Sequence, residues 1–184
     1  MNSYSVLTIV GLTFIRANRY RHGKPCILLK MNKIYDWKPV PYTMAQVNQS
    51  TTMPEKLKED IARIWEDKCR PKNYPYDGFV GGNGTRTGYL PCPWMNMAWL
   101  HCDGEDYADV ENIGPVTYTP YRGFPGYFYP YRNQRGYLSP IVMVQLNQPE
   151  PGVLMNLECT VWAQNIQHNR LKRRGLTHFE LIMD

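Results

Sequence analysis

The stretch from Ile113 to Asn147 constrains the fold more than any other, because it is filled with both aromatic residues and prolines. It contains six tyrosines, two phenylalanines and five prolines, with three arginines among the tyrosines. Proline fixes φ and lacks a backbone donor, which keeps most of this stretch out of helices and central strands. Each buried tyrosine hydroxyl also needs a hydrogen-bond partner, and a core cannot supply so many. The stretch predicts a rigid aromatic surface laid against another protein, or a loop folded over its own domain.

The rest of the composition is that of one ordinary globular domain. The chain has 184 residues, 43% hydrophobic and 20% charged, which is enough for a real core and argues against wholesale disorder. A net charge of +5 is below the basic density of a dedicated nucleic-acid binder. The 15 prolines, 14 glycines and 14 tyrosines favour strands and ordered loops over a helical bundle.

Apolar runs predict a mainly antiparallel β-sandwich with one packed helix. The expected strands are Ser3–Ile15, Pro25–Tyr35, Trp94–Cys102, Leu138–Leu146, Val153–Ala163 and Leu176–Met183. Pro149–Gly152 is expected to turn the fourth and fifth of these into a hairpin. The acidic run from Asp103 to Glu111 and the basic run from Arg170 to Gly175 are interpreted as solvated turns.

The single predicted helix covers Thr51 to Asp67. Thr51 or Thr52 can cap it, and Pro54 suits its first turn. Its apolar stripe consists of Leu57, Ile61, Ile64 and Trp65. Such a stripe indicates that the helix packs on a sheet.

Cysteines and glycosylation sequons favour an extracytoplasmic domain. None of the five cysteines has the CxxC spacing of a zinc site. Their odd number leaves either one free thiol or a partner outside this chain. Asn48 and Asn83 each begin an N-x-Ser/Thr sequon in polar, loop-like surroundings.

No catalytic or metal-binding constellation is present in the sequence, and no cofactor is expected. The four histidines are scattered, without an HxH or HExxH pattern, and no GxSxG elbow occurs. Cys102 beside His101 has the chemistry of an activated thiol, but a disulfide half-cystine is the better reading in this compartment. Tyrosines alternating with arginines can stack single-stranded nucleic acid, although no RNP-like pattern supports that reading. We therefore expect a secreted or membrane-attached binding domain that is not an enzyme.

Four segments resemble the extracellular domain of the sodium/potassium-transporting ATPase β subunit family, in its arthropod form above all. They are Gly23–Pro39 (GKPCILLKMNKIYDWKP), Cys102–Pro115 (CDGEDYADVENIGP), Arg122–Leu146 (RGFPGYFYPYRNQRGYLSPIVMVQL) and Asn156–Ile166 (NLECTVWAQNI). Their order and spacing are close to those of the family. The resemblance places the ectodomain at residues 19–184, with residues 1–18 outside the family pattern. The family's membrane helix and first disulfide have no counterpart in the sequence.

The resemblance implies an immunoglobulin-like sandwich in a glycoprotein subunit that lacks catalytic activity. Such a subunit assists the folding of the catalytic α subunit, its delivery to the plasma membrane and its transport of potassium and sodium. Cys102 and Cys159 occupy the positions of the family's third disulfide. Cys26 occupies one half of the middle disulfide, whose other half, expected near Val10, is missing. We infer a Cys69–Cys92 bridge only from the two cysteines that remain.

In the family the aromatic stretch lies near the extracellular loops of the α subunit. The expected contact residues are Tyr127, Phe128, Tyr129, Pro130, Tyr131 and Tyr137. An alternative is an adhesion or junctional glycoprotein that uses the same ectodomain independently of the pump.

Overall fold

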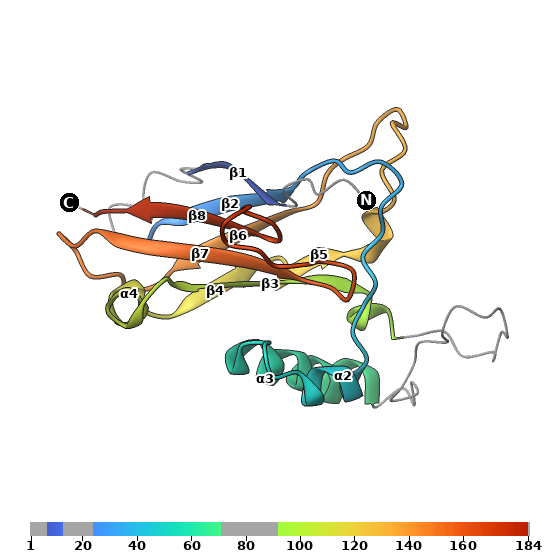
Figure 1. Cartoon of the computed structure of the whole chain (residues 1–184), viewed down its shortest axis with the longest axis horizontal. Helices are drawn as coiled ribbons and strands as arrows, with labels where there is room; N and C mark the ends of the chain where they lie inside the picture. Colours follow the sequence, from blue (N-terminus) through green and yellow to red (C-terminus); the bar gives the residue numbers. More distant parts are fainter. Residues whose placement is uncertain (1–6, 13–23, 71–91, 184) are drawn as a thin grey trace, which may run out of the picture.

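The chain forms a two-sheet antiparallel β-sandwich, as the sequence predicts, with helices against one face (Figure 1). The computed structural model describes residues 7–12, 24–70 and 92–183. The strands are β1 (Leu7–Leu12), β2 (Cys26–Met31), β3 (Met97–Gly104), β4 (Val116–Thr119), β5 (Gly123–Pro125), β6 (Ile141–Leu146), β7 (Met155–Trp162) and β8 (Leu176–Leu181). The helices are α2 (Met44–Gln49), α3 (Glu55–Ile64) with its π-helical extension η1 (Trp65–Cys69), α4 (Tyr107–Ile113), and the 3₁₀ turns η3 (Pro93–Met95) and η4 (Gly126–Phe128).

The two sheets have the strand orders β1-β2-β6-β4 and β5-β3-β7-β8. Alternation along β2 sends Ile27, Leu29 and Met31 into the space between the sheets. Leu100 of β3 and Val161 of β7 meet them from the opposite sheet. This is the alternating inside-outside pattern of a sandwich core.

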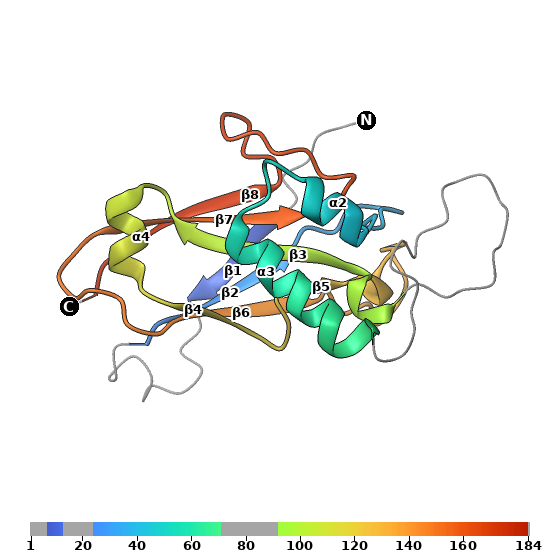
Figure 2. The same ribbon diagram turned by 90° about the horizontal axis from the view of Figure 1, so that it is seen from below.

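Strand β3 is buried on both faces, because the helices cover the side of its sheet that faces away from the sandwich core. Figure 2 shows α3 lying across β3 from this side. Leu57 and Ile61 of α3 pack with Trp99 of β3 and Trp162 of β7 in a second core cluster. Burial on both faces explains why the sequence around β3 is apolar without alternation.

Helix α3 agrees with the predicted helix in position but differs at both ends. The N-cap residue is Pro54, without a side-chain hydrogen bond, so neither Thr51 nor Thr52 caps the helix as expected. At the other end the helix continues as the π-helical η1 and buries Trp65 and Cys69. Of the predicted stripe, Leu57, Ile61 and Trp65 are buried and Ile64 is half-buried.

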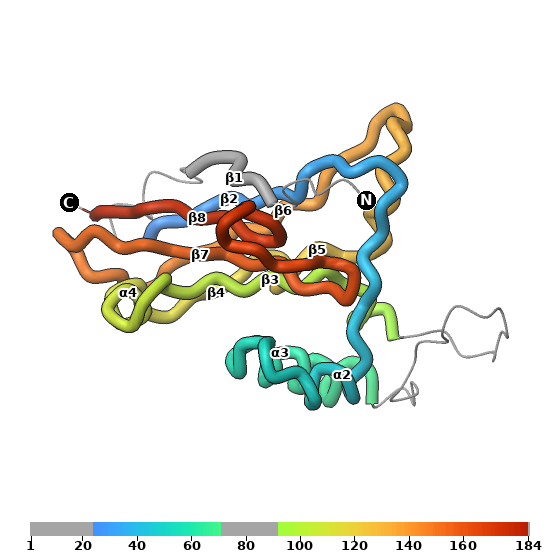
Figure 3. Tube along the Cα trace, in the orientation of Figure 1, coloured from blue at the N-terminus to red at the C-terminus, as the bar shows by residue number. Residues whose placement is uncertain are grey.

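The predicted hairpin between β6 and β7 is wrong, because these strands lie in different sheets. The connecting segment bonds to other parts of the chain: Glu150 N donates to Asn112 O at 2.8 Å, and Gly152 N donates to Met183 O at 2.6 Å. Figure 3 shows this crossing at the end of the sandwich that holds the C-terminus. The prolines of this segment mark a turn, but they do not determine with which strand the following residues pair.

Two further predictions are corrected near the middle of the chain. The acidic run contains a helix, α4, where a solvated turn was expected, and Asp106 caps it by accepting from Asp109 N at 3.0 Å. Asp109 is buried and accepts a hydrogen bond from Asn156 N at 2.9 Å. The aromatic stretch, expected to be a loop, also contains the strands β4 and β5, which at four and three residues are too short for a periodic signal.

Candidate partner-binding surface

The aromatic stretch ends in a lobe at the end of the sandwich opposite α4 (Figures 1 and 2). The turn η4 begins the lobe and the long connection to β6 completes it. Gly126 lets η4 sit directly on the chain before β3, because a Cβ at this position would lie 2.2 Å from Asn96 Oδ1. The backbone also joins here, with Gly126 N donating to Asn96 O at 2.7 Å. The start of the lobe is therefore fixed to the chain directly before β3.

Two aromatic rings of η4 form the most exposed pair of the lobe. Tyr127 is 70% exposed, Phe128 is half-buried, and their ring centroids lie 4.6 Å apart. The Tyr127 ring makes this contact while most of its surface stays open to solvent. Large aromatic side chains already held in place lose little conformational entropy on binding, which suits them to protein interfaces.

A second aromatic pair, Tyr131 and Tyr137, lies in the connection to β6 with ring centroids 4.9 Å apart. Lys33 extends over both rings, with Nζ 5.2 Å from the Tyr131 centroid and 5.9 Å from the Tyr137 centroid. Burial raises the pKa of Tyr137, although a hydrogen bond with Ser139 opposes this effect. The phenol of Tyr137 therefore stays neutral beside the lysine.

The segment after β2 forms the other side of this lobe. Asp36 N donates to Tyr131 O at 2.8 Å, and Arg132 Nε lies 2.6 Å from Asp36 Oδ1. These bonds leave Tyr35 69% exposed beside Tyr131, and Leu138 is 78% exposed on the same connection. The sequence does not identify Lys33, Tyr35 and Leu138 as residues of this surface, because no local pattern signals that the two segments meet.

Tyr129 and Pro130 differ from the other expected contact residues. The ring of Tyr129 packs edge-on against Trp37 at 5.4 Å, and its hydroxyl donates to Met31 Sδ at 3.0 Å. Burial raises the pKa of this phenol far above its ordinary value. Pro130 is half-buried. Tyr129 thus extends the core cluster between the sheets, whereas Tyr127, Phe128, Tyr131 and Tyr137 lie outside that cluster.

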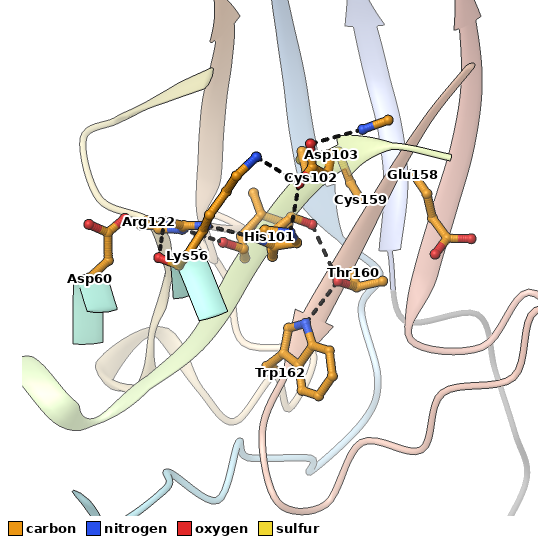
Figure 4. A network of polar contacts seen from close by, with 12 residues as sticks. Lys56, Asp60, His101, Cys102, Asp103, Arg122, Glu158, Cys159, Thr160 and Trp162 are labelled. Atoms are coloured by element: carbon orange, nitrogen blue, oxygen red, sulfur yellow. Dashed lines mark hydrogen bonds and ion pairs between the residues drawn. A yellow bond between two sulfur atoms is a disulfide. The ribbon is translucent and has the colours of Figure 1, made fainter. Parts of the chain in front are cut away.

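Arg122, the residue before β5, holds helix α3 against the sheet (Figure 4). Its guanidinium forms an ion pair with Asp60 and donates to Lys56 O of the helix at 3.1 Å. On the sheet side it donates to Leu100 O at 3.2 Å and lies 2.7 Å from His101 Nδ1. Arginine has no acceptor, so Nδ1 accepts and the ring proton of His101 sits on Nε2, 3.6 Å from Asp103 Oδ2. The network joins elements of the fold and offers no nucleophile.

The cysteines form two bridges in the described part of the chain. Sγ atoms of Cys69 and Cys92 are 2.06 Å apart, as are those of Cys102 and Cys159, which face each other across β3 and β7. Cys102 therefore carries no thiol for His101 to activate. Cys26 is half-buried at the start of β2. The Cys69–Cys92 bridge joins the end of η1 to the residue before η3 and so fixes the helical layer near the sheet.

The two sequons have different positions relative to the described residues. Asn48 is exposed in the last turn of α2, where a loop was expected, and Ser50 is the residue that ends this helix. Asn83 lies outside the described residues. Within residues 7–12, 24–70 and 92–183, no group of three or more metal-ligating side chains comes together, and no helix is long and apolar enough to span a bilayer.

Comparison with known proteins identifies relatives over nearly the whole chain. The family model described as "Sodium / potassium ATPase beta chain" matches residues 16–180. The sodium/potassium-transporting ATPase subunit beta-2 of Drosophila melanogaster is 42% identical over 171 residues, which cover 92% of this chain and 46% of that protein. Subunit beta-1 of the same species is 35% identical over 167 residues, covering 90% and 44%. The probable subunit beta-3 of Caenorhabditis briggsae is 27% identical over 165 residues.

The fold and the aromatic lobe define a disulfide-containing β-sandwich with an exposed aromatic surface at one end. By its sequence the chain belongs to the sodium/potassium ATPase beta chain family. It spans about half the length of the curated relatives that it matches.

Proposed function

We propose that this chain is the extracellular part of a β subunit of a sodium/potassium-exchanging ATPase. In this role it binds the catalytic α subunit, assists its folding and its delivery to the plasma membrane, and supports potassium and sodium transport without catalysing a reaction itself. It lies on the extracellular face of the plasma membrane. The proposal rests on membership of the β chain family over residues 16–180.

The aromatic lobe is the surface proposed to bind the α subunit. Tyr127 and Phe128 present a ring pair on a turn that is fixed to the sheet, and Tyr131 and Tyr137 present a second pair beside Lys33. Hot spots of protein interfaces are rich in tyrosine, and they lie where surrounding contacts exclude water. A lobe with two ordered ring pairs at one end of a sandwich offers such an arrangement.

Co-expression with an α subunit in cultured cells tests the proposal. The chain is precipitated from detergent extracts, and co-precipitated α subunit is measured for the unchanged chain and for Tyr127→Ala. We expect the variant to weaken association by about 2 kcal/mol, the cost of truncating an interface anchor. Tyr107→Ala is the matched control, because Tyr107 is a 93% exposed tyrosine on α4 at the opposite end of the sandwich.

The outcomes separate the pump role from the alternative. Failure of the unchanged chain to bring down α subunit contradicts the proposal. If no α subunit co-precipitates and the same cells adhere to one another through this chain, the adhesion role replaces the pump role. Equal losses with Tyr127→Ala and Tyr107→Ala would keep the partner and reject the aromatic lobe as its binding surface.

A further inference from the structure

The turn that joins β7 to β8 carries a concentration of positive charge that the proposed interface does not use. Within five residues it has the cations Arg170, Lys172, Arg173 and Arg174. Leu171 among them is 98% exposed. Figure 2 shows the β7–β8 connection standing out from the body of the sandwich, at the top of the view. We propose that this turn, Arg170–Arg174, binds sulfated polysaccharide chains of the cell surface and extracellular matrix; the extracellular location rests on the proposed function.

The backbone of the turn is fixed before any ligand arrives. Asn169 and Arg174 pair across its base, with N–O distances of 3.1 and 2.9 Å. Arg173 N donates to Arg170 O at 3.1 Å, and Lys172 N donates to Asn169 Oδ1 at 2.9 Å. Four hydrogen bonds thus hold the short loop, so a ligand need order only the ends of the side chains.

The charges of the turn are poorly balanced by the protein. Arg170 pairs with Glu158 of β7, with Nε 2.9 Å from Oε2. Among the residues that the structure describes, no carboxylate lies within ion-pair distance of Lys172, Arg173 or Arg174. Three neighbouring cations with no such carboxylate among the described residues repel one another, and an anion bound between them removes this repulsion.

The shape and chemistry of the turn favour a linear polyanion. A convex tip cannot enclose a small molecule, and a cavity of about 350 Å³ lies elsewhere, between α3 and β4. The turn offers no aromatic ring on which a nucleic-acid base could stack. Sulfate groups spaced along a sugar chain accept paired hydrogen bonds from guanidinium groups and interact with several cations at once.

Heparin is the probe, and its binding to the purified chain is measured at about 150 mM salt. The triple variant Lys172→Gln, Arg173→Gln, Arg174→Gln should bind about tenfold or more weakly, because three unpaired cations are lost. The matched control is Arg63→Gln, Lys68→Gln, Arg70→Gln. It removes the same charge from exposed side chains that already pair with Asp60, Asp67 and Glu66. The control should bind heparin within about twofold of the unchanged chain.

Two more variants exclude unfolding and other anions as explanations. Lys172→Arg keeps the charge and should retain binding. Glu158→Gln releases Arg170 and should strengthen binding, a gain that damage to the fold would not produce. Equal weakening of heparin binding in both triple variants would show that only the net charge of the chain matters, and it would overturn the proposal. Unchanged heparin binding in the triple variant of the turn would overturn it too.

A membrane surface is the competing partner, since Leu171 could insert between lipids. Vesicles of phosphatidylcholine and phosphatidylserine in equal amounts test this alternative. The turn would be assigned to lipid if the chain bound these vesicles but not heparin, and if Leu171→Ser abolished the vesicle binding. The turn variant should co-precipitate α subunit as the unchanged chain does. Failure of heparin binding with intact α association would therefore reject this inference alone.

Discussion

The hydroxyl of Tyr118 accepts a hydrogen bond from the backbone nitrogen of Cys102 at 2.9 Å, joining β4 of one sheet to β3 of the other. The same oxygen lies 3.4 Å from Cys102 O. Strand β5 pairs with β3 only over Met97–Trp99, so Cys102 lies beyond the end of that ladder. The phenol thus satisfies backbone groups that no neighbouring strand reaches.

Tyr118→Phe should lower the free energy of unfolding by about 1–2 kcal/mol, because it leaves the buried Cys102 amide without its partner. Urea unfolding measures the change. Tyr107→Phe is the control, since the Tyr107 side chain is almost fully exposed, and it should have no effect. Burial raises the pKa of Tyr118, so its contribution to the free energy of unfolding is full below pH 10.0 and falls above it, where the phenol of the unfolded chain ionises first. A difference between the unchanged chain and Tyr118→Phe that stays constant well above pH 10 would contradict the burial of this hydroxyl.

Arg122→Met should destabilise the chain by about 3 kcal/mol, since it breaks a largely buried ion pair and leaves Asp60 without this partner. Arg122→Lys should recover only part of the loss, because a lysine cannot contact Asp60, His101 and Leu100 O together. Both values come from urea unfolding. Full recovery by lysine would show that charge alone matters at this position.

Asp103 should make stability depend on pH in the acid range. Burial acts to raise the pKa of this carboxyl, but hydrogen bonds from His101, Lys56 and Gly104 N and the charge of Lys56 outweigh it, so the pKa lies below 3.8. A depressed pKa means that the stabilisation is present above pH 3.8 and is lost as the pH falls through the folded value. Unfolding midpoints measured from about pH 6 down to about pH 3 should fall less steeply in Asp103→Asn. An identical pH profile in the variant would rule out this contribution.

Tyr129→Ala should behave as a core substitution, with a loss of about 3 kcal/mol in unfolding free energy. Its ring contacts Trp37 and its hydroxyl contacts Met31, both on the side of the core. Tyr127→Ala should change unfolding by less than about 0.5 kcal/mol, since its side chain is mostly exposed. Thermal unfolding of the two variants side by side gives the comparison. Similar stabilities would mean that Tyr129 contributes little to the core.

The sequence predicts well which segments with strong periodicity form strands or helices. It predicts less well which strands pair with one another. The alternation along β7 and the apolar stripe of α3 identify both elements, because each depends on burying one face. The connection between β6 and β7 reads as a hairpin, and nothing local in Pro149–Gly152 reveals that it crosses between sheets. Strand pairing depends on contacts distant in sequence, which a local pattern does not contain.

The aromatic stretch shows the same limit at the candidate site. Its six tyrosines are equivalent in a sequence reading, yet Tyr118 and Tyr129 point into the fold while Tyr127 faces solvent. What separates them is the position of Cys102 and Met31, residues supplied by other strands. Composition can therefore predict an aromatic surface, whereas identifying which of its residues face solvent requires knowledge of the fold.

The pairing of β2 with β6 also determines how long β2 lacks this partner strand while the chain is synthesised. Cys26 lies opposite Gln145, roughly 120 residues later, and Ile27 lies opposite Val144. A ribosome adds residues at about 5–20 per second, so β2 waits on the order of ten seconds before its partner exists. During that interval an apolar strand is available to any neighbouring chain. The nascent protein is therefore most vulnerable to misassembly before its last third is made, and folding factors would be needed most in that period.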